Sequence, residues 1–478
     1  MSRKEKNGNA AADAEITKVD GMTDAEREED FFEEKEPPKK KKRVRRKDMT
    51  PEQRKRRRIK DLIITGTVFG VILLFFAICA LCSFVGYKGN FEWIAGLGEL
   101  DYESEWTLVD IDDEANTTGY YEFVPADNDP EAEFTVLQLT DVHIGAGAFS
   151  AKKDRWAMEA VASVIRRVQP DLVVVSGDIA YPVPFQAGTF NNKREAEMFA
   201  TLMEELGVYW TLCFGNHDTE AYSLYTRDEI GDFYQNDGRW EHCLFRKGPE
   251  DVSGVGNDMI VVKDYQGKII QSIVTVDSHS YTDGDILGIA WKYDNIHDDQ
   301  MDWYANEIQR LTEINAKRFE NPEVKNIMFF HIPLRQYNEY YFASKTADGL
   351  ISEDTELEAF RGAHVEKLYG QAGEKGEKSF PGMNTDKVVE TMLANYGQGT
   401  FCGHDHYNTY ALDIQLKDGR SFRLSYGMSI DYLAYAGIVG KIEQRGGQEI
   451  KISQDGSFVQ RQRPYAEQLE TDEVLTWR

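Results

Sequence analysis

The sequence predicts an α/β fold from about residue 133 onward, preceded by a charged tail and one membrane-spanning helix. Three observations carry this prediction. Short apolar, β-branched segments alternate with amphipathic segments of helical period after residue 133. A single long stretch before them contains no charge, and the residues before that stretch are mostly charged. Apolar residues make up 41% and aromatic residues 12% of the chain, as in a globular protein with a core. This composition excludes a wholly disordered chain, a collagen-like chain and a multi-span membrane protein.

The first element is a tail, residues 1–61, that we expect to be disordered and cytoplasmic. Residues 1–60 contain 20 Lys and Arg and 14 Asp and Glu, without apolar periodicity. Fourteen of the basic residues lie within residues 39–60. Such a run is also typical of a nuclear-import signal or a nucleic-acid patch. The segment that follows it favours a different role.

The second element is a predicted transmembrane helix over residues 62–85. These 24 residues carry no charge. As a helix they extend about 36 Å, which is enough to cross a bilayer core with some tilt. A signal peptide would lie nearer the N-terminus, and a buried core helix is the other alternative. The basic residues at 39–60 precede the span, so we expect a cytoplasmic N-terminus, contact of these residues with anionic lipid headgroups, and an outward-facing body.

Residues 86–132 form an acidic juxtamembrane segment with weak patterning. The sequence leaves two interpretations open for it, a linker or an outer strand of the body.

The first part of the body, which we place at residues 133–460, alternates strands with helices. We predict strands at 134–140, 172–176 and 208–214, with helices at 151–169 and 193–206. This order implies right-handed crossovers and mostly parallel pairing.

The second part continues this pattern and ends in hairpins. We predict strands at 269–276, 326–330 and 399–402 and a helix at 298–315. Alternating segments at 410–416, 422–426, 439–443 and 449–452 indicate antiparallel hairpins that complete the sheets. The last two would be joined through Gly446 and Gly447. Residues 461–478 are left as a C-terminal tail.

Side chains typical of metal ligands follow five of the predicted strands. They are Asp141, His143, Asp178, Asn216, His217, His331, His404 and His406. Open α/β sheets carry their ligand sites at the carboxyl ends of the strands. Any one of these segments alone is also compatible with a loop cap, a turn or a core histidine, but five in order favour a shared site. Mixed imidazole, carboxylate and amide ligands suit Mn, Fe or Zn.

These segments resemble the motifs of the calcineurin-like metallophosphoesterase superfamily. The matching segments are DVH (141–143), GD (177–178), GNHD (215–218), His331 and GHDH (403–406). The resemblance covers about residues 133–440 and implies a β-sandwich of two mixed sheets flanked by helices. The segments GDIAY (177–181), DQMDWY (299–304) and FHIPL (330–334) are similar to the purple-acid-phosphatase-like branch. In that branch a tyrosine at the place of Tyr181 is a ligand, but His143 stands where glycine is usual, so the role of Tyr181 stays open.

The resemblance implies a centre of two divalent metal ions and a metal-bridging hydroxide that attacks phosphorus in line. It assigns one metal to Asp141, His143 and His406 and the other to Asn216, His331 and His404. Asp178 would bridge the two. His217 would contact the phosphate or act as general acid, and we expect Asp218 to orient its ring.

The remaining polar residues receive less specific interpretations. Asp405 is expected to cap a loop rather than to act in catalysis, and Arg335 to lie at the surface. Residues 335–383 are polar and contain Gly370, Gly373 and Gly376, which favours a lid over the site. Four histidines outside the motifs are expected to be structural: His242, His279, His297 and His364.

The sequence therefore predicts a membrane-anchored, outward-facing phosphohydrolase, with phosphomonoesters as the favoured substrates. Residues 61–478 carry 35 Lys and Arg and 68 Asp and Glu, which argues against broad nucleic-acid binding. Two dications at the site would still hold an anionic phosphate. Three alternatives remain: a phosphodiesterase or pyrophosphohydrolase acting on nucleotide, lipid or wall-polymer substrates, a non-enzymatic surface scaffold, and a nuclear or nucleic-acid protein. Five cysteines are too few for a disulfide framework.

Overall fold

The computed structural model describes residues 48–127, 129–285, 288–373, 378–435, 444–466 and 475–476. The predicted tail up to residue 47 and the predicted strand at 439–443 lie outside these residues. The chain divides into two compact units, residues 1–72 and 73–478.

Helix α1 (Pro51–Ile94) contains the predicted membrane span and extends beyond it at both ends. The expectation of disorder is therefore wrong for residues 51–61, which are helical. It is long and apolar enough to cross a membrane, with a mean hydropathy of 2.9 in its most apolar window, of which 6% is buried. The helix ends at Ile94 instead of residue 85, because its last turns pack on the body. The side chain of Asn90 donates to the carbonyl oxygen of Ala151 at 3.0 Å, and the Tyr87 hydroxyl donates to Glu197 at 2.6 Å.

The body contains two mixed β-sheets, as the sequence analysis expected. The larger has nine strands in the order β1-β2-β6-β7-β8-β10-β12-β11-β9. In chain order these strands are β1 (Trp106–Val109), β2 (Tyr121–Pro125), β6 (Asp258–Lys263), β7 (Ile269–Thr275), β8 (Lys325–Phe329), β9 (His364–Tyr369), β10 (Gly397–Cys402), β11 (Ala411–Gln415) and β12 (Ser421–Tyr426). Since β1 and β2 form one edge of this sheet, the outer-strand interpretation of residues 86–132 is confirmed for these two segments.

The smaller sheet has six strands in the order β15-β14-β13-β3-β4-β5. They are β3 (Phe134–Leu139), β4 (Leu172–Ser176), β5 (Trp210–Cys213), β13 (Gly446–Ile452), β14 (Phe458–Pro464) and β15 (Leu475–Thr476). Strands β3, β4 and β5 pair in parallel, as predicted.

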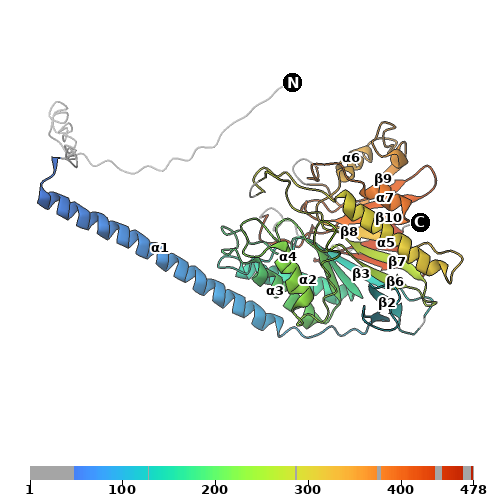
Figure 1. Ribbon diagram of the computed structural model, residues 1–478, viewed down its shortest axis with the longest axis horizontal. Coiled ribbons are helices and arrows are strands. Elements are labelled where there is room, and N and C mark those ends of the chain that lie inside the picture. The colour runs from blue at the N-terminus through green and yellow to red at the C-terminus, as the bar shows by residue number, and fades with distance from the viewer. Residues whose placement is uncertain are drawn as a thin grey trace, which may run out of the picture. The chain divides into compact units, whose positions relative to one another are not determined.

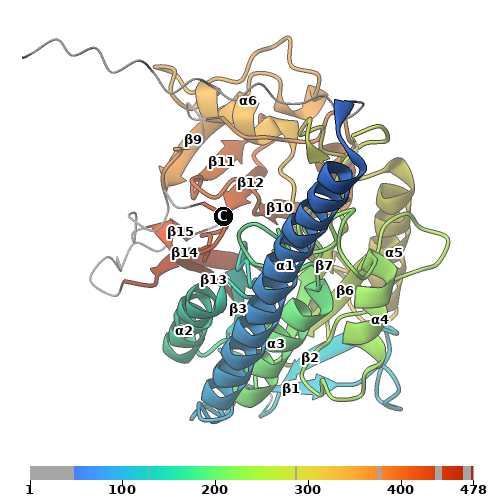
Figure 2. The same cartoon turned by 90° about the vertical axis from the view of Figure 1, so that its left-hand side faces the viewer.

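Helices cover the outer face of each sheet (Figures 1 and 2). Helices α2 (Ala151–Val168), α3 (Asn192–Leu206) and α4 (Arg227–Asn236) lie on the smaller sheet. Helices α5 (Asp298–Ala316), α6 (Arg335–Ala343) and α7 (Val388–Ala394) lie on the larger sheet, and a short 3₁₀ helix, η3, spans Glu358–Phe360.

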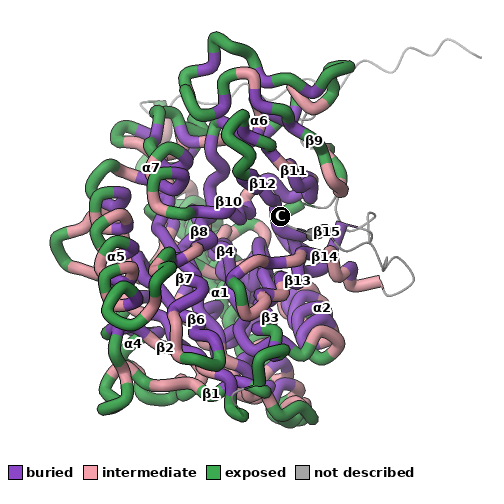
Figure 3. Tube along the Cα trace, turned by 90° about the vertical axis from the view of Figure 1, so that its right-hand side faces the viewer, coloured by how far each residue is buried: buried purple, intermediate pink, exposed green. Residues whose placement is uncertain are grey.

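The apolar core has three layers, one between the two sheets and one under the helices on each outer face. Side chains that alternate along each strand contribute to two of these layers. In β4, Val173 and Val175 face helices α2 and α3, whereas Leu172 and Val174 face the other sheet. The inner layer is completed from the larger sheet by residues such as Ile327. The strands are accordingly buried along most of their length (Figure 3).

The position predicted for the turn of the C-terminal hairpin is wrong. Gly446 and Gly447 begin strand β13, which pairs with β14 and with β3, and the turn lies at residues 453–457. The physical reason is close packing, because a Cβ on Gly447 would lie 2.7 Å from Cδ1 of Leu137. Strand β14 also carries the sheet to Pro464, beyond the predicted limit at residue 460.

Parallel strands place the motif segments together. Strands β7, β8, β10 and β12 run parallel in one sheet, and β3, β4 and β5 in the other. Their carboxyl ends therefore meet at one edge of the sandwich, where ligand sites of such sheets lie.

Candidate metal centre

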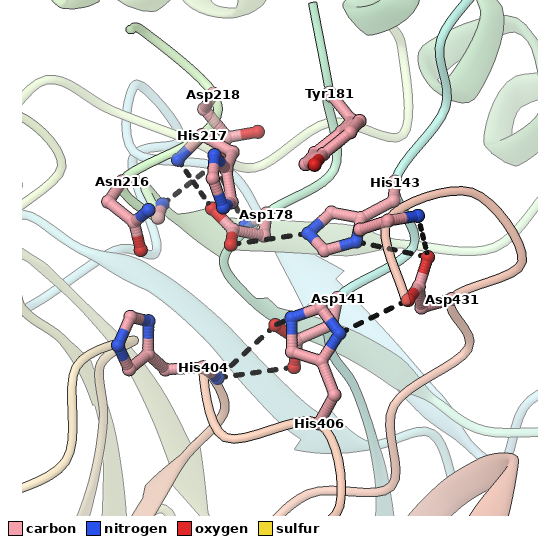
Figure 4. A network of polar contacts seen from close by, with 12 residues as sticks. Asp141, His143, Asp178, Tyr181, Asn216, His217, Asp218, His404, His406 and Asp431 are labelled. Carbon is pink, nitrogen blue, oxygen red and sulfur yellow. Dashed lines mark hydrogen bonds and ion pairs between the residues drawn. The ribbon is translucent and has the colours of Figure 1, made fainter. Parts of the chain in front are cut away.

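Side chains from several strand ends converge at this edge (Figure 4). The segments after β3, β4 and β5 bring Asp141, His143, Asp178 and Asn216, and those after β8 and β10 bring His331, His404 and His406. All seven predicted ligands therefore lie in one cluster. The side chains of His143, Asp178, His331 and Asp141 are at most 1% exposed.

Asp178 lies at the middle of the cluster. Its Oδ2 atom is 3.0 Å from Nε2 of His331 and 3.3 Å from Nε2 of His143. Its Oδ1 atom accepts the backbone N–H of His217 at 2.8 Å. A carboxylate placed between two imidazoles from different strands has the position of a bridging ligand.

Two groups of potential ligands share this carboxylate. Asp141, His143, Asp178 and His406 offer ligand atoms within 4.8 Å of one another, and Asp178, His331 and His404 do the same. Oδ1 of Asp141 lies 3.3 Å from Nε2 of His406, and Nε2 of His331 lies 3.4 Å from Nδ1 of His404.

The hydrogen bonds around these groups fit a metal. Nδ1 of His331 lies 2.9 Å from the carbonyl oxygen of Ser176, which can only accept, so the neutral ring presents a lone pair on Nε2. Metal-binding histidines are typically oriented by such a bond on the outer nitrogen. Asn216 is fully buried and its Oδ1 atom has no hydrogen-bond partner. A buried amide oxygen without a partner is costly unless a cation binds it.

The backbone is strained where it presents these ligands. Asp141, His143, Asp178 and His404 have φ angles of 50°, 53°, 56° and 74°, which L-residues rarely adopt. Strain of this kind collects at functional sites, where the surrounding structure holds it. A Cβ on Gly215 would lie 2.1 Å from Oδ1 of Asp178, which explains the glycine of the GNHD segment.

The charges of the cluster are strongly coupled. Burial alone raises the pKa of Asp178, but the nearby charges of His331 and His217 hold it well below the usual range. Burial lowers the pKa of His143, but the carboxylates of Asp431 and Asp178 outweigh this effect and raise it to about 10. Burial and the charge of His331 together lower the pKa of His404. These opposing shifts arise from anionic and basic ligands packed without solvent.

Asp431 is a member of the site that the sequence analysis missed. It lies after β12, and its two carboxylate oxygens are each 3.2 Å from Nδ1 of one histidine, His143 or His406. It is fully buried. The signal was present, because residues 422–426 were predicted as a strand and Gly427 to Asp431 follow it, as in the other motifs.

His217 has a different partner from the predicted one. Its Nδ1 atom lies 2.7 Å from Oε1 of Glu220, and its side chain is 21% exposed. Asp218 instead accepts the backbone N–H groups of Gly215, Asp178 and Ala180. The prediction that Asp218 orients His217 is therefore wrong, because its carboxylate is used to fix the two loops.

Tyr181, Asp405 and the predicted lid lie around the cluster. The Tyr181 hydroxyl donates to Gln186 at 2.9 Å, while its ring lies 4.8 Å from that of His143. Asp405 accepts the backbone N–H of Phe380 and the hydroxyl of Tyr426, as a structural carboxylate. The predicted lid is only partly a loop, since it contains α6, η3 and β9.

An opening beside the cluster has aromatic walls. It is lined by His217, Trp291, Tyr293, Phe380, His404, Asp405, His406 and Tyr435. Among the described residues that line it, none is a lysine or an arginine. An anionic group entering here would have to be held by bound cations and by the histidines.

Comparison with known proteins finds one family. Residues 134–367 match the model of the calcineurin-like phosphoesterase family. The match includes the predicted ligands from Asp141 to His331, whereas His404 and His406 lie beyond it. The chain is 27% identical over 301 residues to Phosphatase DCR2 of Saccharomyces cerevisiae, a match covering 59% of this chain and 45% of the yeast protein. The chain thus spans less than half of that relative.

Three solved structures are similar at low identity. A dimetal phosphatase from Danio rerio has 11% identity and a TM-score of 0.40, covering 72% of this chain and 99% of that one. Purple acid phosphatase PPD1 from yellow lupin has 12% identity and a TM-score of 0.39, covering 75% and 56%. NAD nucleotidase from Haemophilus influenzae has 13% identity and a TM-score of 0.34, covering 70% and 55%.

Proposed function

Since residues 134–367 of this chain belong to the calcineurin-like phosphoesterase family, whose members are metal-dependent hydrolases, we propose that it is a membrane-anchored, outward-facing phosphomonoesterase. The observation that carries the proposal is the pair of ligand groups that share Asp178. A phosphorylated substrate and a divalent metal cofactor follow from the family and from the donor set.

Two ions are proposed, with the ligand sets given above and Asp178 common to both. Mn, Fe and Zn all suit mixed imidazole, carboxylate and amide donors. Divalent ions at such a site supply charge neutralisation on phosphate and a lowered pKa for bound water. The protein residues orient this chemistry: Asp431 holds two of the histidines, and Asp178 ties together the loops after β4 and β5.

His217 is proposed to serve the leaving group. It lines the opening with a side chain that is 21% exposed, and Glu220 fixes its ring through Nδ1. Its other nitrogen is then free to donate to a phosphate oxygen or to the departing alcohol.

The walls of the opening favour monoesters. Trp291, Tyr293, Phe380 and Tyr435 crowd the approach to His404 and His406. A terminal phosphoryl group needs room among these rings for one substituent, whereas a diester needs room for two. The second candidate, a phosphodiesterase or pyrophosphohydrolase, uses the same metal ligands.

The test uses the full chain purified in detergent without chelator. p-Nitrophenyl phosphate and bis-p-nitrophenyl phosphate are each assayed with Mn²⁺, and bound metal is measured by mass spectrometry. We expect metal-dependent hydrolysis of the monoester that is lost in Asp178→Asn and kept in Asp418→Asn, which changes a surface carboxylate. Preference for the diester would favour the second candidate. A chain that binds no metal and hydrolyses neither ester would leave the surface-scaffold alternative.

A further inference from the structure

A second cluster of metal-binding side chains lies outside the centre described above. His279 and His297 each offer a ring nitrogen, and Asp294 a carboxylate oxygen, and these atoms lie within 4.8 Å of one another. The two imidazole rings are stacked, with centroids 4.1 Å apart and planes 21° from parallel. Two imidazoles and one carboxylate are a donor set typical of zinc.

Hydrogen bonds determine which nitrogen of His279 carries the proton. Its Nε2 atom lies 3.1 Å from Oε1 of Gln300. The orientation of that amide is fixed, because its Nε2 donates at 2.8 Å to the backbone carbonyl of Asp277, which can only accept. Oε1 of Gln300 is therefore an acceptor, the proton of neutral His279 is on Nε2, and Nδ1 presents a lone pair.

His297 lies between α5 and Asp294. Its Nδ1 atom lies 3.2 Å from Oγ of Ser253, whose hydroxyl donates at 2.6 Å to the carboxylate of Asp299. Its side chain also caps α5, where it accepts from the backbone N–H of Gln300. Its Nε2 atom lies 3.4 Å from Oδ2 of Asp294.

Nε2 of His297 and the carboxylate of Asp294 lie close enough to be bridged by one cation. The outer N–H of His279 is tied to Gln300, as in imidazoles that are oriented toward a metal.

The cluster closes the base of a loop that reaches the catalytic opening. His279 follows β7, and His297 precedes α5. Between them, Tyr281 and Tyr293 pair through an isolated β-bridge. The ring of Tyr293 lies 4.3 Å from that of His404, and the Tyr281 hydroxyl is 3.1 Å from Nδ2 of Asn216. An ion that joins the two ends of the loop would hold both tyrosines beside the metal centre.

We propose that His279, Asp294 and His297 bind a zinc-class divalent ion that fixes the loop carrying Tyr281 and Tyr293 beside the catalytic opening. This site goes beyond the proposed phosphatase function and does not depend on it, because its ligands are separate from the seven residues of the centre. Joining the ends of a loop reduces the number of conformations that the loop can adopt.

The test measures zinc binding and protection from trypsin, without any substrate. The full chain in detergent is stripped with chelator, dialysed and given Zn²⁺, and bound zinc per chain is measured by mass spectrometry. Lys292 is the one trypsin target within residues 280–296 and is exposed, so its cleavage reports on the loop. We expect zinc to slow this cleavage at least 10-fold in the unaltered chain and in Asp178→Asn.

His297→Gln and Asp294→Asn are expected to lose one equivalent of zinc and the protection of Lys292. His242→Gln, which changes a histidine bonded to Glu204, should keep both. Asp294→Asn does not change the residue that caps α5, so it tests the zinc site even if His297→Gln does not fold. Zinc content equal to that of the unaltered chain in Asp294→Asn, or cleavage at Lys292 that zinc does not affect, would overturn the proposal.

Discussion

At the residue scale, the carboxylate of Asp431 contacts two histidines that are proposed as metal ligands. One oxygen faces Nδ1 of His143 and the other faces Nδ1 of His406. Burial raises the pKa of Asp431, but the charges of these histidines outweigh it and hold the pKa well below the usual range. The group therefore stays ionised, and we propose that it positions these two histidines for the metal centre.

Asp431→Asn is expected to weaken Mn²⁺ binding by about 10- to 100-fold, the usual effect of removing an outer partner of a ligand histidine. An amide has one acceptor oxygen, so its NH₂ group would face the N–H of one histidine. Isothermal titration of the chelator-treated chain measures the affinity. Asp413→Asn in β11 serves as the control, and equal affinities in the two variants would contradict this role for Asp431.

Glu220 and Asp218 are predicted to act differently although both lie near His217. Glu220→Gln removes the charge beside Nδ1 of His217, so we expect kcat to fall roughly 10-fold with little change in KM and with a shifted pH profile.

Asp218→Ala leaves three buried backbone N–H groups without an acceptor. We expect it to lower Tm, because each unpaired group costs about 1–3 kcal/mol of stability. Normal stability of Asp218→Ala would argue against the loop-fixing role.

At the element scale, the end of helix α1 approaches the start of α2 closely. A Cβ on Gly86 would lie 2.4 Å from Cβ of Ala151, whereas a Cβ on Gly89 meets nothing within 4 Å. Arg155 strengthens the contact by donating to the carbonyl oxygen of Gly89 at 2.7 Å. The helix that contains the predicted span is therefore joined to the body by direct packing.

Gly86→Ala and Gly89→Ala form a matched pair in one helix. Both replacements favour the helix by about 0.5–1 kcal/mol, but the first also introduces a clash. We expect Gly89→Ala to raise Tm of the full chain in detergent and Gly86→Ala to lower it. Two variants with the same increase would show that α1 does not pack on α2 at Gly86.

Asp171 joins the segment before β1 to strands β3 and β4, and it gives stability a pH dependence. It accepts from the Ser104 hydroxyl at 2.5 Å and from the backbone N–H of Thr135 at 2.8 Å. Burial raises its pKa to about 6, despite these hydrogen bonds. In the unfolded chain the pKa of an aspartate is near 3.9. Between about pH 4 and 6 the folded state therefore binds a proton at Asp171 that the unfolded chain has released, and the free energy of unfolding falls as pH rises over this range.

Asp171→Asn lacks this titration. Its Tm relative to the unaltered chain should therefore increase as pH rises from 4 to 6, by the equivalent of up to roughly 3 kcal/mol. Asp101→Asn, an exposed change in the same segment, is the control. A Tm difference between Asp171→Asn and the unaltered chain that is constant over this range would contradict the raised pKa.

At the scale of the whole molecule, charge is divided between the two sides of the apolar helix. Residues 1–60 have an excess of Lys and Arg, and the remainder has 68 Asp and Glu against 35 Lys and Arg. Positive residues beside a span favour the cytoplasmic side. The orientation proposed for the chain rests on this asymmetry.

External protease applied to intact cells is expected to digest the body and to leave an N-terminal tag protected. Replacing the basic residues of 39–43 and 54–58 with glutamine should reduce the fraction of chains with this orientation. The same number of glutamines placed at lysines and arginines of the body is the control. A body that is protected in intact cells would reverse the proposed topology.

Strands such as 172–176 and helices such as 151–169 were predicted to within a residue, because alternation and helical period are local properties of the chain. The family was recognised because its ligands follow strand ends in a fixed order. The turn at Gly446 was misassigned, since a glycine that permits close packing has the same signature as a glycine that permits a turn.

The sequence by itself determined the apolar helix, the α/β alternation, the order of the ligand segments and the family. Only the tertiary structure decided that Glu220 and not Asp218 bonds His217, that Asp431 holds His143 and His406, and that His279 and His297 meet across a loop. The physical reason is that secondary structure and motifs depend on neighbours along the chain. Hydrogen-bond partners and metal ligands depend on which side chains the folded strands and loops bring within about 3 Å.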